Sequence, residues 1–169
     1  MLTLDLVRLR QERTLPVEAS VDADADLWAG SGLVFQGPIE IKAAAQVTAD
    51  GGVLIRGQWD ADVRYECGRC LDPLDVGGSR ELSLLWMPAD GWETDDPDVR
   101  TIGPGERTLD FAEAFREEVL LELPRYVLPE EDEEGRCSSC GKTTDGFRRE
   151  GDQRGSDPRW AKLKALKSE

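Results

Sequence analysis

The chain has 169 residues, of which 39% are hydrophobic and 33% charged, and its formal net charge is −14. This length provides one ordinary hydrophobic core, and the excess of negative charge argues against sequence-independent electrostatic binding to nucleic acid, which depends on lysine and arginine. There is no histidine, which excludes Ser-His-Asp and Cys-His catalysis.

The N-terminal region predicts two short strands, over residues 3–8, where Leu4 and Leu6 alternate with polar residues, and over residues 15–20. The first ten residues lack a secretory signal pattern. The chain also has no run of about 18 apolar residues, the length that a membrane span requires. We therefore expect a cytoplasmic protein.

The strongest local pattern is a β-hairpin in the middle of the chain. Apolar residues occupy most odd positions over residues 39–49 and 53–65, with polar residues between them. This period of two is typical of strands with one buried face. A three-residue loop over residues 50–52 keeps apolar residues opposite one another, for example Val47 opposite Ile55. The last glycine of this loop would take the left-handed conformation.

After the hairpin, residues 81–87 predict a further strand, and residues 88–107 predict a long acidic surface loop because they are rich in proline, glycine and aspartate. The tryptophans divide according to these elements. We expect Trp59 and Trp86, on apolar strand faces, to lie in the core, and Trp28 and Trp92, in loop-like sequence, to be more exposed.

A helix is expected over residues 110–123. Asp110 and Glu113 have the spacing of a capping box, and large apolar residues then recur every four positions, at Phe111, Phe115, Val119 and Leu123. Pro124 ends the helix, because proline disfavours a helical conformation in the residue before it.

The composition changes near residue 129, where the acidic run 130–134 begins. Asp157 followed by Pro158 indicates the start of a C-terminal helix. We expect a β-rich core domain over residues 1–129 and a second region over 130–169. The predicted fold class is α+β: a twisted, mostly antiparallel sheet, with a partial barrel as one form, one packed amphipathic helix and a short C-terminal helix.

Four cysteines form two Cys-x-x-Cys pairs, Cys67 with Cys70 and Cys137 with Cys140. Two such turns supply the four thiolates of a tetrahedral structural Zn²⁺ site, and Gly141 suits the end of such a turn. Sixty-six residues separate the two pairs, far more than the roughly 15–20 of a compact zinc ribbon. Only the fold could therefore bring the two pairs together.

Other states of the cysteines stay open. They could be plain reduced thiols, whereas a structural disulfide is disfavoured in a reducing cytoplasm. A redox dithiol of the thioredoxin type would need Cys67 and Cys70 at the start of a helix, and Leu71-Asp72-Pro73 opens none. A thiol-dependent redox protein that uses this pair is the alternative function, and metal analysis separates the two.

The order of the motifs resembles a known family. The chain runs from Cys67-Gly68-Arg69-Cys70-Leu71, through an acidic loop, to a helix that ends Leu120-Leu121-Glu122-Leu123-Pro124, and then to Cys137-x-x-Cys140-Gly141 and Asp157-Pro158-Arg159-Trp160. This order is similar to that of the YceD family, the large ribosomal RNA subunit accumulation proteins. Some members keep only the first cysteine pair, which implies that a metal in this chain would pin the tail to the core.

The resemblance implies a non-enzymatic role in ribosome biogenesis that supports accumulation of 23S rRNA. The expected partners are large-subunit rRNA or a pre-50S particle, a basic ribosomal protein, or both, with no membrane and no small-molecule substrate. The net charge of −14 would attract a basic ribosomal protein, and the acidic segments could shield one before it meets RNA. An RNA contact must be local or mediated by a partner.

Candidate partner-binding residues lie in the first cysteine pair and near the C-terminus. Arg69 could contact a phosphate or an acidic partner, or it could be a solvated turn residue. The C-terminal helix could stack Trp160 on an unpaired base, although we favour docking of its apolar stripe on a protein surface. The candidate set is Arg69, Arg159, Trp160, Lys162 and Lys164.

Overall fold

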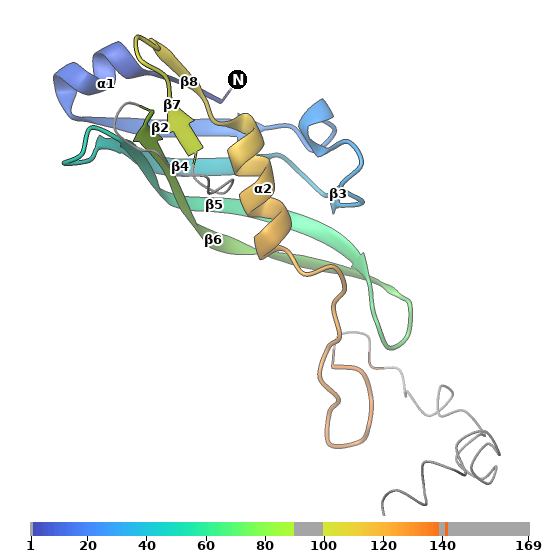
Figure 1. Ribbon diagram of the computed structural model, residues 1–169. Helices are drawn as coiled ribbons and strands as arrows, with labels where there is room; N and C mark the ends of the chain where they lie inside the picture. The colour runs from blue at the N-terminus through green and yellow to red at the C-terminus, as the bar shows by residue number, and fades with distance from the viewer. Residues whose placement is uncertain (1, 90–99, 139–140, 142–169) are drawn as a thin grey trace, which may run out of the picture. The chain divides into compact units, whose positions relative to one another are not determined.

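The computed structural model describes residues 2–89, 100–138 and 141. They divide into two compact units, here called the sheet unit (residues 2–65, 73–89 and 100–125) and the cysteine unit (residues 66–72, 126–138 and 141). The elements in chain order (Figure 1) are β1 (Thr3–Asp5), α1 (Leu6–Glu12), β2 (Thr14–Val21), the 3₁₀ helix η1 (Asp26–Trp28), β3 (Val34–Phe35), β4 (Ile39–Val47), β5 (Val53–Glu66), β6 (Pro73–Pro88), β7 (Arg100–Ile102), β8 (Thr108–Asp110) and α2 (Ala112–Glu122).

The main sheet has six strands. Five follow the order β2-β4-β5-β6-β7, and β3 pairs with β5 outside this path. The pairs β2–β4, β3–β5 and β4–β5 are antiparallel, whereas β6–β7 is parallel. Strands β1 and β8 form a separate antiparallel pair. The predicted α+β class with a mostly antiparallel sheet is confirmed, and among the described strands the sheet is open, with β2 and β7 at its edges. The predicted C-terminal helix lies outside the described residues.

The predicted central hairpin is present, but its register differs from the prediction. Val47 lies opposite Val53, whereas the sequence pattern placed Ile55 there. Both registers pair odd positions with odd positions, so both keep apolar residues opposite one another. The alternation therefore fixes the buried face but does not distinguish between the two registers.

Local hydrogen bonds around the turn account for the observed register. The loop has three residues, as predicted, but they are 49–51: the Thr48 N–H donates to the Gly52 carbonyl at 3.0 Å, and the Gly52 N–H donates to Thr48 Oγ1 at 2.9 Å. Gly51, rather than Gly52, takes the left-handed conformation, with φ of +80°. A loop shifted by one residue changes the pairing by two, which is the observed difference.

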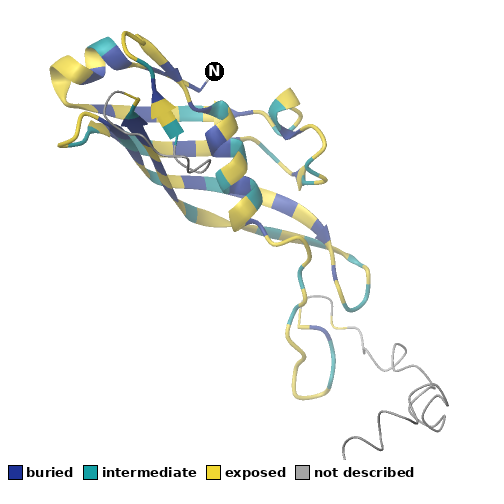
Figure 2. Cartoon of the chain, in the orientation of Figure 1, coloured by how far each residue is buried: buried dark blue, intermediate teal, exposed yellow. Residues whose placement is uncertain are grey.

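The core lies between one face of the sheet and α2. Buried and exposed residues alternate along the strands, visible as dark blue and yellow bands in Figure 2. Phe115 of α2 is fully buried, and its ring centroid lies 6.0 Å from that of Trp59 and 6.1 Å from that of Trp28. Helix α2 therefore covers the apolar face that the odd positions of β5 provide.

The tryptophan predictions are partly wrong. Trp59 and Trp86 are buried as expected, but Trp28 is also buried, at 5% exposure. Its ring packs 4.8 Å from that of Phe35, and its Nε1 donates to the Asp22 carbonyl at 3.1 Å. The short helix η1 carries this indole into the core, which its loop-like sequence does not indicate. Trp92 lies outside the described residues.

The N-terminal strand prediction over residues 3–8 is also wrong in its second half. The chain leaves β1 at Asp5, whose carboxylate accepts hydrogen bonds from the N–H groups of Val7 at 2.9 Å and Arg8 at 3.0 Å. This is an N-cap, and α1 begins at Leu6. Leu6 and Leu9 are fully buried, so the apolar residues of this segment have a helical spacing as well as an alternating one.

The predicted acidic loop over residues 88–107 contains further structure. Its residues 100–102 form β7, which pairs in parallel with the end of β6, Trp86 lying opposite Arg100. Residues 90–99 lie outside the described part of the chain. The loop prediction therefore missed a strand of only three residues, too short to show a period.

Helix α2 confirms the predicted helix but not its predicted cap. The N-cap is Phe111, and the Asp110 carboxylate accepts a hydrogen bond from the Ala112 N–H at 2.9 Å, one residue earlier than a capping box requires. The helix ends before Pro124 as predicted, because Leu123 is extended with ψ of 127°.

Candidate metal centre

The first Cys-x-x-Cys turn follows the end of β5 and is closed by backbone hydrogen bonds. The Leu71 N–H donates to the Cys67 carbonyl at 2.9 Å, and the Cys67 N–H donates to the Asp72 carbonyl at 2.8 Å. The Arg69 N–H lies 3.5 Å from Cys67 Sγ. A backbone N–H that points at sulfur favours the thiolate form, which is the form that binds metals.

A second segment of the cysteine unit packs against this turn. The Gly68 N–H donates to the Val127 carbonyl at 2.8 Å, and Cys67 forms a parallel β-bridge with Val127. A side chain at position 68 would lie 3.1 Å from the Val127 carbonyl oxygen. The first turn therefore sits close to residues 126–128, and glycine at position 68 permits this approach.

Cys137 is brought to the first turn by a tight reversal over residues 131–137. Glu131 forms an antiparallel bridge with Cys137. Within the reversal, Asp132 Oδ1 accepts hydrogen bonds from the N–H groups of Glu134 at 3.0 Å and Arg136 at 2.8 Å. The backbone N–H of Arg136 is the largest cause that lowers the pKa of Asp132 below its ordinary value of 3.8. A charged Asp132 therefore helps to hold the segment that carries Cys137.

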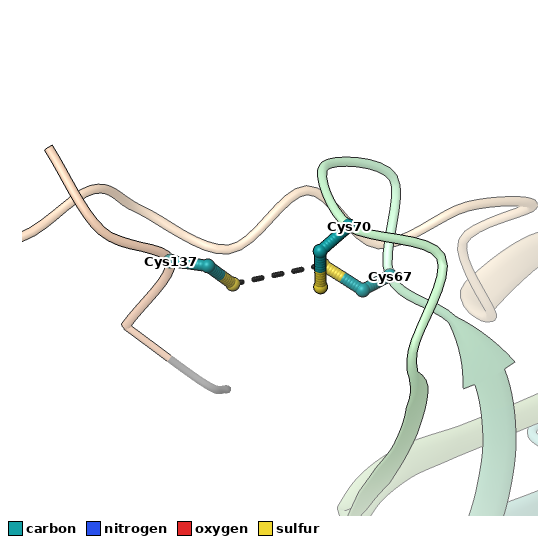
Figure 3. A group of neighbouring side chains, drawn as sticks. All are labelled: Cys67, Cys70 and Cys137. Carbon is teal, nitrogen blue, oxygen red and sulfur yellow. Dashed lines mark hydrogen bonds between the residues drawn. The ribbon is translucent and has the colours of Figure 1, made fainter. Parts of the chain in front are cut away.

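The sulfur atoms of Cys67, Cys70 and Cys137 all lie within 4.8 Å of one another. Figure 3 shows the first two coming from one turn and the third from the facing segment. Cys67 Sγ and Cys137 Sγ are 3.6 Å apart, and both residues are buried, at 1% and 0% exposure. In tetrahedral zinc with Zn–S bonds of ~2.3 Å, neighbouring sulfurs lie about 3.8 Å apart. The cluster could therefore hold a metal ion, and its donors are the soft thiolates that zinc accepts.

The second Cys-x-x-Cys turn has the same backbone signature as the first where it is described. The Gly141 N–H donates to the Cys137 carbonyl at 2.8 Å, as Leu71 does to Cys67, and Gly141 has φ of +69° against +61° for Leu71. Cys140 lies outside the described residues, so its predicted role as the fourth ligand stays a prediction. The two turns therefore match in this hydrogen bond and in the φ angle of the residue that follows the second cysteine.

Arg69 lies inside the cysteine unit, and its guanidinium has partners there. Its Nε donates to the Pro129 carbonyl, and its Nη1 forms an ion pair with Glu131. These contacts join the first turn to the segment that leads to Cys137. Sequence patterns do not indicate this bridging role, because the partners lie 60 and 62 residues away along the chain. The partner-binding role of Arg69 stays a prediction, and Arg159, Trp160, Lys162 and Lys164 lie outside the described residues.

The surroundings of Cys67 and Cys70 bear on the redox alternative. The chain continues from this pair into strand β6, whereas a thioredoxin-type dithiol stands at the start of a helix. Cys67 is 1% exposed, which restricts access of a substrate disulfide to its sulfur. Both observations favour metal binding over thiol exchange.

Together, these features describe an α+β scaffold with an open, mostly antiparallel sheet and a second unit in which clustered thiols could hold a metal. Comparison with protein families matches residues 55–167 to the family described as "Large ribosomal RNA subunit accumulation protein YceD". The chain belongs to the YceD family. The resemblance that the cysteine and helix-end motifs indicated is thereby confirmed.

Three curated mycobacterial proteins, each named as uncharacterized, are 32% identical to the chain over 116 residues; one is from Mycobacterium bovis and two are from strains of Mycobacterium tuberculosis. The alignment covers 66% of this chain and 54% of each relative, so the chain spans about half the length of these relatives. No solved structure matches the chain. None of the helices in the described part of the chain is long and apolar enough to cross a lipid bilayer.

Proposed function

We propose that the protein is a non-catalytic assembly factor for the large ribosomal subunit, and that Cys67, Cys70, Cys137 and Cys140 bind one structural Zn²⁺ ion. Membership of the YceD family, described by large ribosomal RNA subunit accumulation, supports the assembly role. The observation that carries the metal site is the clustering of three sulfurs from two distant parts of the chain.

The burial pattern of the cysteine unit explains why it would need a metal. Among its described residues, only Cys67 and Cys137 are buried, while Leu71 and Leu128 are 63% and 55% exposed. Units this small rarely fold on apolar burial alone, and a structural metal is one common substitute. A thiolate-bound ion would occupy the place that an apolar core takes in a larger domain.

The experiment for the metal site is elemental analysis of the full chain purified under reducing conditions. We expect one zinc per chain, and a large loss of affinity when any of the four cysteines is changed to serine. Ser138→Ala is the matched control. Ser138 is exposed and has no sulfur to offer a metal, and the alanine variant keeps the backbone hydrogen bond from residue 138 to the Glu130 carbonyl. A metal-free chain with the same amide protection in residues 66–72 and 126–138 would contradict the proposal. Full zinc affinity in Cys140→Ser would contradict the four-thiolate form.

The experiment for the assembly role is sucrose-gradient fractionation with crosslinking, together with 23S rRNA levels after depletion of the protein. We expect the protein to migrate with pre-50S particles and 23S rRNA to fall on depletion, with rescue by the intact chain. Absence from every ribosomal fraction and unchanged 23S rRNA would leave the assembly role without support.

The partner stays open between RNA and a basic ribosomal protein. The net charge of −14 favours a basic protein at long range, and in the described cysteine unit Glu130, Glu131, Asp132, Glu133 and Glu134 are all exposed. A pull-down at low salt that recovers basic ribosomal proteins would support this partner. Recovery of none, while pre-50S association persists, would point to RNA.

A further inference from the structure

A pocket of about 460 Å³ opens in the sheet unit beside the end of α2. Its walls come from the loop over residues 30–33, the end of β5 and the last turn of α2 with the residues that follow it. This volume lies in the range of small-molecule and single-residue binding sites. Three of the lining residues, Leu120, Leu123 and Pro124, belong to the helix-end motif over residues 120–124. The metal site makes no use of them.

The pocket has an unusual charge for this chain. Three of its eleven lining residues are arginines and none is aspartate or glutamate, although the chain has 35 acidic residues against 21 basic ones. In a protein whose overall field repels anions, this lining makes a locally positive hollow. The ligand chemistry that fits it is anionic.

The arginines play different parts. Arg64 forms a bidentate ion pair with Asp75, so its charge is already balanced. Arg116 donates from Nε to the Leu27 carbonyl at 2.7 Å, which fixes the plane of its guanidinium, and its Nη1 forms an ion pair with the exposed Glu113 at 3.4 Å. Arg125 is exposed and makes no hydrogen bond or ion pair with any described residue. It is the cation that a ligand could engage without breaking an existing pair.

The remaining lining groups suit a flat, partly apolar ligand. Leu120, Leu123 and Pro124 form an apolar wall beside the fixed guanidinium plane of Arg116. Tyr65 also lines the pocket; it is 9% exposed, and its hydroxyl has no hydrogen-bond partner among the described residues. Leaving a buried hydroxyl unpaired is unfavourable, so a ligand that supplied an acceptor here would gain affinity.

We propose that this pocket binds an unpaired nucleotide of RNA, with the base against the apolar wall and the Arg116 guanidinium, and a phosphate on Arg125. Proteins that bind single-stranded RNA combine these features: an arginine plane or apolar surface contacts the base, and a cationic side chain contacts the phosphate. The inference rests on the proposed role in large-subunit rRNA accumulation. It selects direct RNA contact over a purely protein-mediated role, and it places that contact in the sheet unit.

The test is fluorescence anisotropy of the full chain with a labelled 12-nucleotide single-stranded RNA, comparing Arg125→Glu with Arg56→Glu. Arg56 is exposed, it likewise has no partner among the described residues, and it does not line the pocket. Both variants change the net charge equally. We expect Arg125→Glu to weaken binding by at least roughly tenfold, the value of one charge-assisted hydrogen bond. Arg56→Glu should change affinity by less than about twofold, as expected for an exposed charge outside the site.

Photocrosslinking followed by peptide mapping gives an independent readout. The proposal expects crosslinks to residues 30–33 and to peptides that contain residues 116–125. Equal weakening by both variants would assign binding to general charge and overturn the pocket site. Displacement of RNA by an acidic peptide at similar concentration would assign the pocket to carboxylates. Pre-50S association in the gradient tests the assembly role separately. If the unmodified chain binds no RNA in the anisotropy assay but still migrates with pre-50S particles, the pocket proposal fails and the assembly role survives.

Discussion

The two Cys-x-x-Cys turns offer a direct test of the metal centre, because they place different residues in the same backbone conformation. Gly141 and Leu71 each follow the second cysteine of a turn, each donates its N–H to the first cysteine carbonyl, and their φ angles are +69° and +61°. Glycine adopts this conformation freely, whereas leucine does not. Exchanging the residue types should therefore have opposite effects on metal affinity.

The magnitude follows from the backbone alone. A β-carbon added at Gly141 would meet no atom within 4 Å, so Gly141→Ala introduces no steric clash. The left-handed conformation costs an L-residue roughly 1–2 kcal/mol, and the smaller unfolded-state entropy of alanine offsets about 0.4–1 kcal/mol of this. The net loss is about 1 kcal/mol, or about fivefold in metal affinity. Leu71→Gly should gain a similar amount, since the leucine side chain is 63% exposed and loses little packing.

The assay is competition for Zn²⁺ between the full chain and a chromophoric chelator in reducing buffer, with Ser138→Ala as the control in the same turn. We expect the affinity order Leu71→Gly above the unmodified chain and Gly141→Ala below it. An unchanged affinity in Gly141→Ala would mean that the second turn does not close around the metal. A loss of affinity in both variants would refute the argument from backbone conformation.

Three further outcomes follow from the described contacts. Phe115→Ala should destabilise the sheet unit by about 3–5 kcal/mol in denaturant unfolding, because the ring is fully buried against Trp28 and Trp59. Its control is Leu121→Ala, at an 84% exposed position of the same helix, which should change stability by less than about 0.5 kcal/mol. After a chelator removes the metal, diamide should oxidise Cys67 and Cys137, whose sulfurs are 3.6 Å apart, to a disulfide, while the diamide is reduced to the hydrazine. Peptide mapping should find this disulfide, and bound zinc should prevent its formation. Since hydrogen bonds hold the pKa of Asp132 below 3.8, its stabilisation of the turn is complete above that value and is lost as the pH falls through the lower folded-state pKa. The protection factor of the Arg136 amide, which corrects for the pH dependence of intrinsic exchange, should therefore fall in acid, and in Asp132→Ala it should already be low at neutral pH.

The main sheet shows which features of a fold can be predicted from the alternation of apolar and polar residues. The odd positions of β5 are buried from Val53 to Tyr65 almost without exception, as the sequence pattern indicated. Register was not predictable from the same pattern, because two registers that differ by two residues bury the same face. The Thr48 hydroxyl and Gly51 selected between them, and both are features of the turn.

Short elements were missed for a related reason. The start of α1 depends on the Asp5 cap, and the place of Trp28 in the core depends on its contact with Phe35. A one-turn helix or a three-residue strand has too few residues to show a period, so local hydrogen bonds and distant packing decide it. The cysteine spacing indicated two pairs that could share one ion across the intervening 66 residues; the structure clusters Cys67, Cys70 and Cys137, and the bound metal stays a prediction.

The acidity of the chain and a phosphate contact should change the salt dependence of RNA affinity in opposite directions, and the net dependence can be measured. When a site neutralises one phosphate of single-stranded RNA, its binding constant falls as salt is added, and the slope of log K against log salt concentration is about −0.7. The net charge of −14 repels the rest of the RNA, and salt screens that repulsion, which offsets part of the loss. We therefore expect a slope between about zero and −0.7, and for Arg125→Glu a slope that is about 0.7 more positive, at zero or above. A slope of several units would require many phosphate contacts, which the single unpaired arginine of the pocket does not provide, and it would refute a local site as the source of RNA binding.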